Sequence, residues 1–169
     1  MRHACILLSA LAAAAMPAPA IAATPAQQSG GRALILVPLT LTKIDDLSFG
    51  SVVPSAISGV VTINASTGAR TFGGGVSGVP SDAGNRAYFG GAGTPSQQVF
   101  VWVDAPAQLS SPAGDTIDVL ALTMDGPALR TIDPTTRAFF VGVGGTLLIG
   151  ADQPEGTYQA TFDVTANYQ

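Results

Sequence analysis

Hydrophobic and polar residues alternate with a period of two over residues 157–168, just before the end of the chain. Side chains alternate between the two faces of a strand, so this pattern predicts a strand with one face on a core and the other in water. A turn at Pro154-Glu155-Gly156 precedes it. The apolar face would consist of Tyr158, Ala160, Phe162, Val164, Ala166 and Tyr168.

A second alternating stripe lies near the other end of the chain, over residues 33–42. Pro38 interrupts it, and a residue without a backbone N–H fits an edge strand, a bulge or a change of sheet. Burying an apolar side chain contributes about 1.5–3 kcal/mol, whereas ordering one backbone residue costs about 1–2 kcal/mol. We therefore expect the stripe to order only in a groove that already exists. Its apolar residues are Ala33, Ile35, Val37, Leu39 and Leu41.

Short apolar runs separated by Gly and Pro clusters make up the rest of the chain, and this pattern is typical of β-sandwiches. We predict an all-β, immunoglobulin-like or pilin-like sandwich with little helix, and a loop over residues 73–85. Residues 99–103 are apolar on both faces, which predicts a central strand covered on both sides, with Trp102 in the core. The remaining strands are expected at residues 47–53, 59–64, 86–89, 97–104, 117–124 and 138–143, with a continuation at 146–149.

The beginning of the chain has the features of a secretory signal. Arg2 and His3 precede an apolar run, and Ala20-Ile21-Ala22 is a small-residue cleavage site. We assign residues 1–22 to the signal, 23–32 to a flexible leader and 33–169 to a single β-sandwich domain. The expected location is the periplasm, the cell surface or the extracellular space.

Cleavage at this site would remove the only His and the only Cys and leave six basic and 11 acidic side chains. Without His or Cys, the usual nucleophile pairs, zinc sites and haem ligands are excluded. The carboxylates lie in turns, where Asp commonly caps backbone amides. We therefore predict no catalytic, cofactor-binding or metal-binding residues and no enzyme. The acidic charge argues against nucleic acid, and no later apolar run is long enough to span a membrane.

The two ends of the chain resemble those of chaperone–usher pilus subunits. Gly156 is the fourteenth residue from the C-terminus, Tyr168 is the penultimate one, and the stripe at residues 33–41 is similar to a donor strand. In that family each immunoglobulin-like subunit lacks its last strand, and a strand of the next subunit completes it. The resemblance implies a donor strand at Ala33, Ile35, Val37, Leu39 and Leu41, and an accepting groove at Gly156, Tyr158, Phe162, Val164 and Tyr168.

Most of the chain after the leader also resembles a family of small secreted proteobacterial proteins known as a domain of unknown function, DUF 4402. This second resemblance implies a family without implying an activity. It rests on residues 38–43, 46–50, 59–63, 143–147, 153–158 and 164–168.

Two functions remain open at this point. The first is an exported structural subunit of a surface fibre or extracellular assembly, polymerising by β-strand complementation. The second is a complete monomeric binding domain that would use the Gly-rich segments 71–85 and 89–96 for an unknown ligand. Expected partners are a second copy of the chain or another surface protein, with a periplasmic chaperone as a further candidate. No cofactor is expected.

Overall fold

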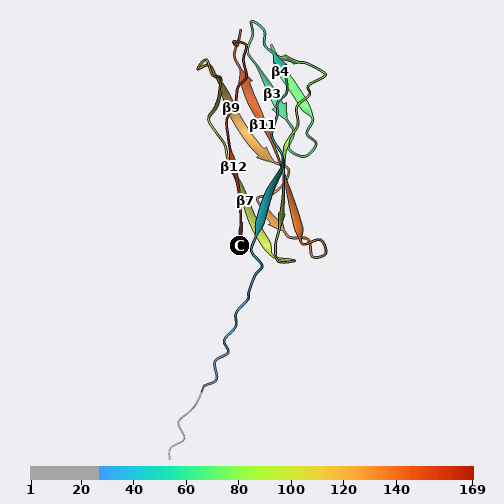
Figure 1. Ribbon diagram of the computed structural model, residues 1–169, viewed down its shortest axis with the longest axis vertical. Coiled ribbons are helices and arrows are strands. Elements are labelled where there is room, and N and C mark those ends of the chain that lie inside the picture. The colour runs from blue at the N-terminus through green and yellow to red at the C-terminus, as the bar shows by residue number, and fades with distance from the viewer. Residues whose placement is uncertain (1–26) are drawn as a thin grey trace, which may run out of the picture. The chain divides into compact units, whose positions relative to one another are not determined.

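A computed structural model describes residues 27–169, so the predicted signal and the first residues of the leader lie outside the described part. The chain divides into two units, Met1–Leu34 and Ile35–Gln169. In the first unit, residues 27–34 form neither helix nor strand and are exposed. The second unit is built from strands, and the described residues contain no helix (Figure 1). The predicted all-β class is confirmed.

Twelve strands make up the second unit, and two of them are only two residues long. They are β1 (Thr40–Asp45), β2 (Val52–Val53), β3 (Gly59–Ile63), β4 (Arg70–Gly74), β5 (Ser77–Gly78), β6 (Ala87–Ala92), β7 (Gln98–Asp104), β8 (Gln108–Ser110), β9 (Thr116–Met124), β10 (Leu129–Thr131), β11 (Ala138–Ile149) and β12 (Asp163–Tyr168).

The larger sheet is organised around β11, which is twelve residues long. Residues 138–143 of β11 pair antiparallel with β6, which in turn pairs with β1. Further along, β11 pairs with β3, and β3 pairs with β4. The other edge of β11 pairs with β9 and, through it, with β8. One long strand therefore joins two halves of the sheet that have different neighbours.

A three-stranded sheet with the order β10-β7-β12 covers the first half of the larger sheet. Alternate residues of β7 point into the space between the sheets, so that Val99 and Val101 are fully buried. They pack in one cluster with Val141 and Val143 of β11, and Val164 and Ala166 of β12 contact the same cluster. Of the apolar face predicted for residues 157–168, the part from Phe162 onward contacts this core.

The second half of the larger sheet has a different cover. Val61, Ile117, Leu147 and Ile149 form a separate buried cluster there. Phe49 and Tyr158 pack against it from segments that flank the sheet face, and β2 pairs with β5 nearby. Neither β7 nor β12 extends over this half: β12 begins at Asp163, opposite Asp104 at the end of β7. The two halves of one sheet are therefore buried to different extents.

Several strands differ from their predicted bounds. Residues 33–42 were predicted as one strand, but β1 starts at Thr40. Residues 157–168 were also predicted as one strand, but the ladder starts at Asp163, because β7 ends at Asp104 and offers no partner beyond it. Within 47–53, the only named strand is β2. The predicted loop at 73–85 contains the end of β4 and all of β5. Strands β8 and β10 were not predicted.

The prediction that Trp102 is a core residue is wrong. Phe100, Trp102 and Asp104 alternate with the inward-facing valines of β7 and therefore share its outer face. Trp102 is half-buried, Phe100 is 46% exposed, and the centroids of these two rings lie 6.1 Å apart. The strand is central in its sheet, but only one of its faces is covered. Hydrophobic composition alone does not distinguish these two situations.

We predict that the first core cluster dominates folding stability. Ile132 is fully buried in this cluster, so Ile132→Ala should lower the free energy of unfolding by about 2–5 kcal/mol through lost burial and a residual cavity. Ile57 is 69% exposed, and Ile57→Ala should change the free energy of unfolding by less than about 0.5 kcal/mol. Urea unfolding followed by circular dichroism measures both. Equal effects of the two variants would contradict this assignment of the core.

Candidate functional site

An apolar groove lies on the second half of the larger sheet, with a volume of about 640 Å3. Its floor consists of side chains from β8, β9 and β11, which are the strands that lack a covering sheet there. A pocket of this size is in the range that holds a small ligand or a peptide segment. The floor residues are Leu109, Ile117, Val119, Leu122, Leu147 and Ile149.

One wall of the groove is the segment 47–54, which contributes Leu47, Phe49 and Val52. The backbone of this segment makes its bonds toward the neighbouring loop and β5. Ser48 exchanges backbone hydrogen bonds with Asn85, at 2.9 and 2.8 Å, and Val52 pairs with Gly78. Between these two points the chain is not a regular strand, since Gly50 has a φ of +67°. The Phe49 carbonyl accepts a hydrogen bond of 2.8 Å from Arg70, and the Ser51 carbonyl accepts one of 3.1 Å from the Val79 amide.

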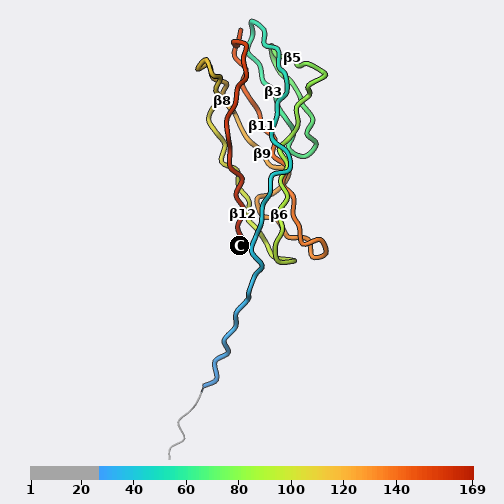
Figure 2. The backbone as a smooth tube through the Cα atoms, in the orientation of Figure 1, coloured from blue at the N-terminus to red at the C-terminus, as the bar shows by residue number. Residues whose placement is uncertain are grey.

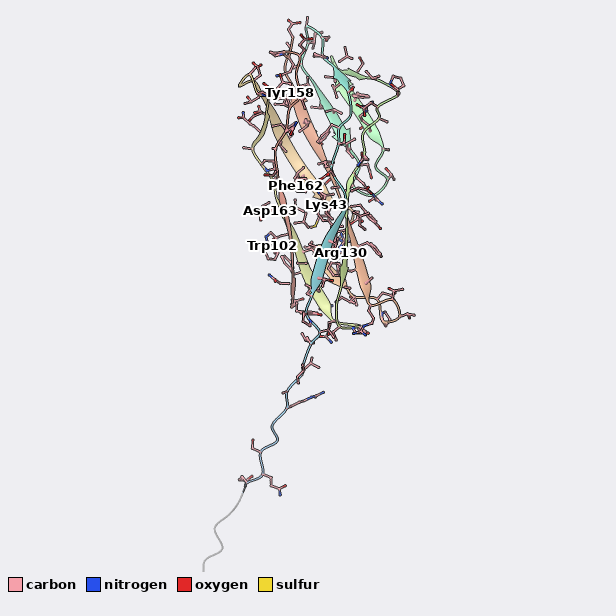
Figure 3. All side chains as sticks on the ribbon, in the orientation of Figure 1. Lys43, Trp102, Arg130, Tyr158, Phe162 and Asp163 are labelled. Atoms are coloured by element: carbon pink, nitrogen blue, oxygen red, sulfur yellow. The ribbon has the colours of Figure 1, made fainter. Side chains whose placement is uncertain are left out.

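The opposite wall is the segment 154–162, which contributes Tyr158, Ala160 and Phe162 (Figure 3). Figure 2 shows this segment as the run of chain that leads into β12. Gln159 exchanges two backbone hydrogen bonds with Ser110, each 3.0 Å long. Because backbone groups alternate between edges, the N–H and C=O of Tyr158 and Ala160 face the groove, and no residue between 27 and 169 bonds them. The segment 154–162 therefore presents an unpaired backbone edge to the groove.

Side-chain hydrogen bonds fix the outer end of this second wall. The Tyr158 hydroxyl donates to the Pro154 carbonyl at 2.7 Å and accepts from the Gln153 amide at 3.0 Å. The same amide group of Gln153 also donates to the Thr116 carbonyl of β9 at 3.2 Å. The turn that precedes the wall is thus tied to the sheet, and the groove keeps its width without an occupant.

Gly156 lies at this outer end and has space around it. A Cβ placed there would meet Ser111 and Tyr158 no closer than 3.7 Å, which is ordinary van der Waals distance. The subunit itself therefore does not require glycine at this position. A large side chain at residue 156 would instead extend toward the groove opening.

The predicted groove residues divide into two sets. Gly156, Tyr158 and Phe162 line the groove. Val164 and Tyr168 pack against the first core cluster, on the part of the segment that pairs with β7. The floor residues on β8, β9 and β11 were missed, because alternation along one strand does not identify the strands across from it.

Tyr168 instead holds the point where the N-terminal stripe joins the sandwich. Its hydroxyl donates to the Val37 carbonyl at 2.7 Å and accepts from the Thr94 amide at 2.8 Å. The Val37 amide donates to the Thr94 hydroxyl at 2.8 Å. Gly93 makes room for this contact, since a Cβ there would collide with the Tyr168 hydroxyl. Val37 is therefore fixed to the body by both of its backbone groups.

The predicted donor residues are split on either side of Pro38. Leu39 and Leu41 pack against the core of their own subunit, and β1 pairs with β6 from Thr40 onward. Ile35 is 92% exposed and Val37 is 46% exposed, and Ala33 is also exposed. Only the part of the stripe before Pro38 is free of the sheet.

The groove lining carries few charged side chains. Among the described residues, no group of three His, Cys, Asp or Glu side chains could hold a metal ion. The charged residues of the lining are Asp82 and Glu155, and both are acidic. Across the described range, no helix is long and apolar enough to cross a membrane. The lining thus combines apolar side chains with hydroxyl, amide and acidic groups.

We predict that the Tyr168 hydroxyl stabilises the junction at Val37. Tyr168→Phe removes two hydrogen bonds and should lower the free energy of unfolding by about 1–3 kcal/mol. It should also accelerate amide hydrogen exchange at Thr94, which loses its acceptor. Tyr158→Phe is the matched control, because its hydroxyl bonds lie at the other end of the segment. If Thr94 exchanged no faster in Tyr168→Phe than in the control, the role assigned to this hydroxyl would be wrong.

The comparisons with known proteins give a family and no activity. Residues 39–168 match the family model described as "Domain of unknown function (DUF4402)". Neither the curated proteins nor the solved structures gave a match to the chain. The matched region starts at Leu39 and includes all twelve strands, both walls of the groove and its floor. The chain belongs to the DUF4402 family.

Proposed function

We propose that the protein is an exported structural subunit of a surface fibre or extracellular assembly, which polymerises by β-strand complementation. The groove accepts an extended segment of a neighbouring molecule, whose backbone pairs with the open edge of the wall at residues 154–162. Export is supported by the signal-like sequence of residues 1–22. The proposal assigns no catalytic role, since the groove is lined mostly by aliphatic and aromatic side chains.

The observation that carries the proposal is the combination of an apolar floor with an unpaired backbone edge at Tyr158 and Ala160. Buried N–H and C=O groups are nearly always paired, and an open edge is a template for another strand. An added strand would satisfy the Tyr158 and Ala160 backbone groups and cover the half-buried Val119 and Leu122. A compact ligand would cover the floor but would leave the backbone edge open. An extended peptide therefore suits this site better.

The segment before Pro38 is the best donor within this chain. Ala33 and Ile35 lie on one face and are exposed in the isolated molecule, whereas the backbone of Val37 is bonded to Thr94 and Tyr168. Leu39 and Leu41 already belong to their own sheet, so the donor proposed here is shorter than the stripe suggested by the sequence. Main-chain hydrogen bonds would supply much of the affinity, and the alternating side chains would fix the register.

A complete monomeric binding domain is the second candidate. The observation that favours it is the pairing of β1 with β6, which gives the first half of the sandwich a closed core without any partner. The Gly-rich segments proposed for ligand binding are less favourable for this role, since much of them is occupied by β4, β5 and β6. Under this alternative the groove itself would hold the ligand.

Gly156→Trp should abolish polymers without unfolding the subunit. The indole would fill the groove opening, whereas the subunit has space for a side chain at this position. Light scattering coupled to size-exclusion chromatography of the exported product measures the assembly, and thermal unfolding checks the fold.

Ala113→Trp is the matched control, because Ala113 is an exposed turn residue outside the groove lining. It should polymerise like the unmodified protein. Polymers of unchanged size in Gly156→Trp would refute the proposal, as would an unmodified protein that stays monomeric at every concentration.

A further inference from the structure

The N-terminal segment 27–36 and the groove lining carry charges of opposite sign. The positions of these charges define the register of a donor strand in the groove. Arg32 is the only charged side chain between residues 27 and 38. The charged side chains of the groove lining, Asp82 and Glu155, are both acidic. We propose that Arg32 of a second copy of the chain lies beside Asp82 in the assembled state and sets the depth to which the leader enters the groove. This inference rests on the proposed function.

The direction of the donor follows from the way its own subunit holds it. Val37 is hydrogen-bonded to Thr94 and Tyr168 of its own molecule. Leu36 is therefore the last residue of the N-terminal segment that can extend away from the sandwich. The inner end of the groove, at Leu47 and Phe162, adjoins the covered half of the sandwich. The outer end, at Pro54 and Gly156, lies at the far end of the two walls. Leu36 must therefore lie at the outer end, with the preceding residues deeper.

This direction runs the donor parallel to residues 47–54 and antiparallel to residues 154–162. With Leu36 beside Pro54, counting back along both segments brings Arg32 beside Gly50. The distance between Leu36 and Arg32 in an extended strand is about 13 Å. Glu155 lies at the outer end, next to Gly156, so this distance separates it from Arg32. The register therefore selects Asp82 over Glu155.

Asp82 lies against the wall at this same depth. Its carboxylate accepts a hydrogen bond of 2.7 Å from the Ser51 hydroxyl, and the residue is exposed. The nearby cation Arg70 directs its guanidinium at carbonyl oxygens, those of Phe49, Ser51 and Val79. The ion pairs of the described residues, Lys43–Asp46 and Arg130–Asp125, do not involve Asp82. Its carboxylate therefore has capacity for a further cationic partner.

The alternation of side chains over residues 31–36 agrees with placing Arg32 beside Asp82. In a strand, Arg32 lies on the opposite face from Ala33 and Ile35. When Ala33 and Ile35 face the apolar floor, Arg32 faces outward, where a charged side chain can stay hydrated and still reach the exposed Asp82. Counting one residue further back brings Gly31 beside Phe49 of the wall. Small residues of the donor thus meet the large residues of the acceptor.

A charge-exchange experiment tests this pair. Arg32→Glu and Asp82→Arg should each slow polymer elongation about five- to tenfold, because each places like charges together. The double variant, with the two charges exchanged, should recover most of the rate of the unmodified protein. The differences should shrink at about 1 M salt, where the screening length is about 3 Å. Light scattering of the exported product gives the elongation rates.

The controls separate this inference from the proposed function. Glu155→Arg should not rescue Arg32→Glu. Asp82→Asn keeps an acceptor for the Ser51 hydroxyl, so it should slow elongation without loss of folding, which thermal unfolding checks. If all variants elongated at the rate of the unmodified protein, the register would be wrong while strand complementation would stand. Rescue by Glu155→Arg alone would also overturn the Asp82 assignment. An unmodified protein that never polymerises would overturn both.

Discussion

The structure depends on a mismatch in length between two layers of the sandwich. Strand β11 is twelve residues long and is paired along most of its length, whereas β12, which helps to cover it, has only six residues. Over the first half, β7 and β12 bury the inner face of β11 in a closed core. Over the second half, the apolar floor continues but the covering sheet does not. The groove follows from this mismatch, because its floor is flanked by β2 and by residues 154–162 but is not covered by the second sheet.

Two residues at the edge of the sandwich separate the part of the chain that folds from the part that is free. Pro38 lacks a backbone N–H and lies just before the start of β1. Tyr168 holds Val37 through its carbonyl, so the chain is anchored immediately before this proline. The apolar residues that follow complete the subunit, and those that precede are exposed. The residues of one hydrophobic stripe therefore lie in two different environments.

Much of the fold could be predicted from the sequence. The all-β class is correct, and the strands predicted at 59–64, 97–104 and 117–124 agree with β3, β7 and β9 to within one residue at each end. Gly156, Tyr158 and Phe162, predicted as part of an accepting groove, lie in the lining of the groove, and their role in assembly stays a prediction. Strong local signals explain these successes, since alternation, valine-rich runs and Gly or Pro turns act over a few residues.

The remaining features depend on contacts that local patterns do not encode. The alternation of residues 157–168 is uniform, yet only the half from Asp163 onward finds a ladder partner, because that is where β7 is available. Trp102 faces outward because the covering layer lies on the other face of its sheet. The floor of the groove combines β9 with β11, and the pairing of these two strands is a non-local property.

Electron microscopy of the unmodified protein tests the central claim most directly. If the uncovered half of the sheet accepts a strand from a neighbouring molecule, the protein should form filaments in which each subunit contacts the next through the groove. The density should show an additional strand between residues 47–54 and 154–162 of every internal subunit. Dispersed single subunits at all concentrations, or filaments in which the groove stays empty, would contradict the account.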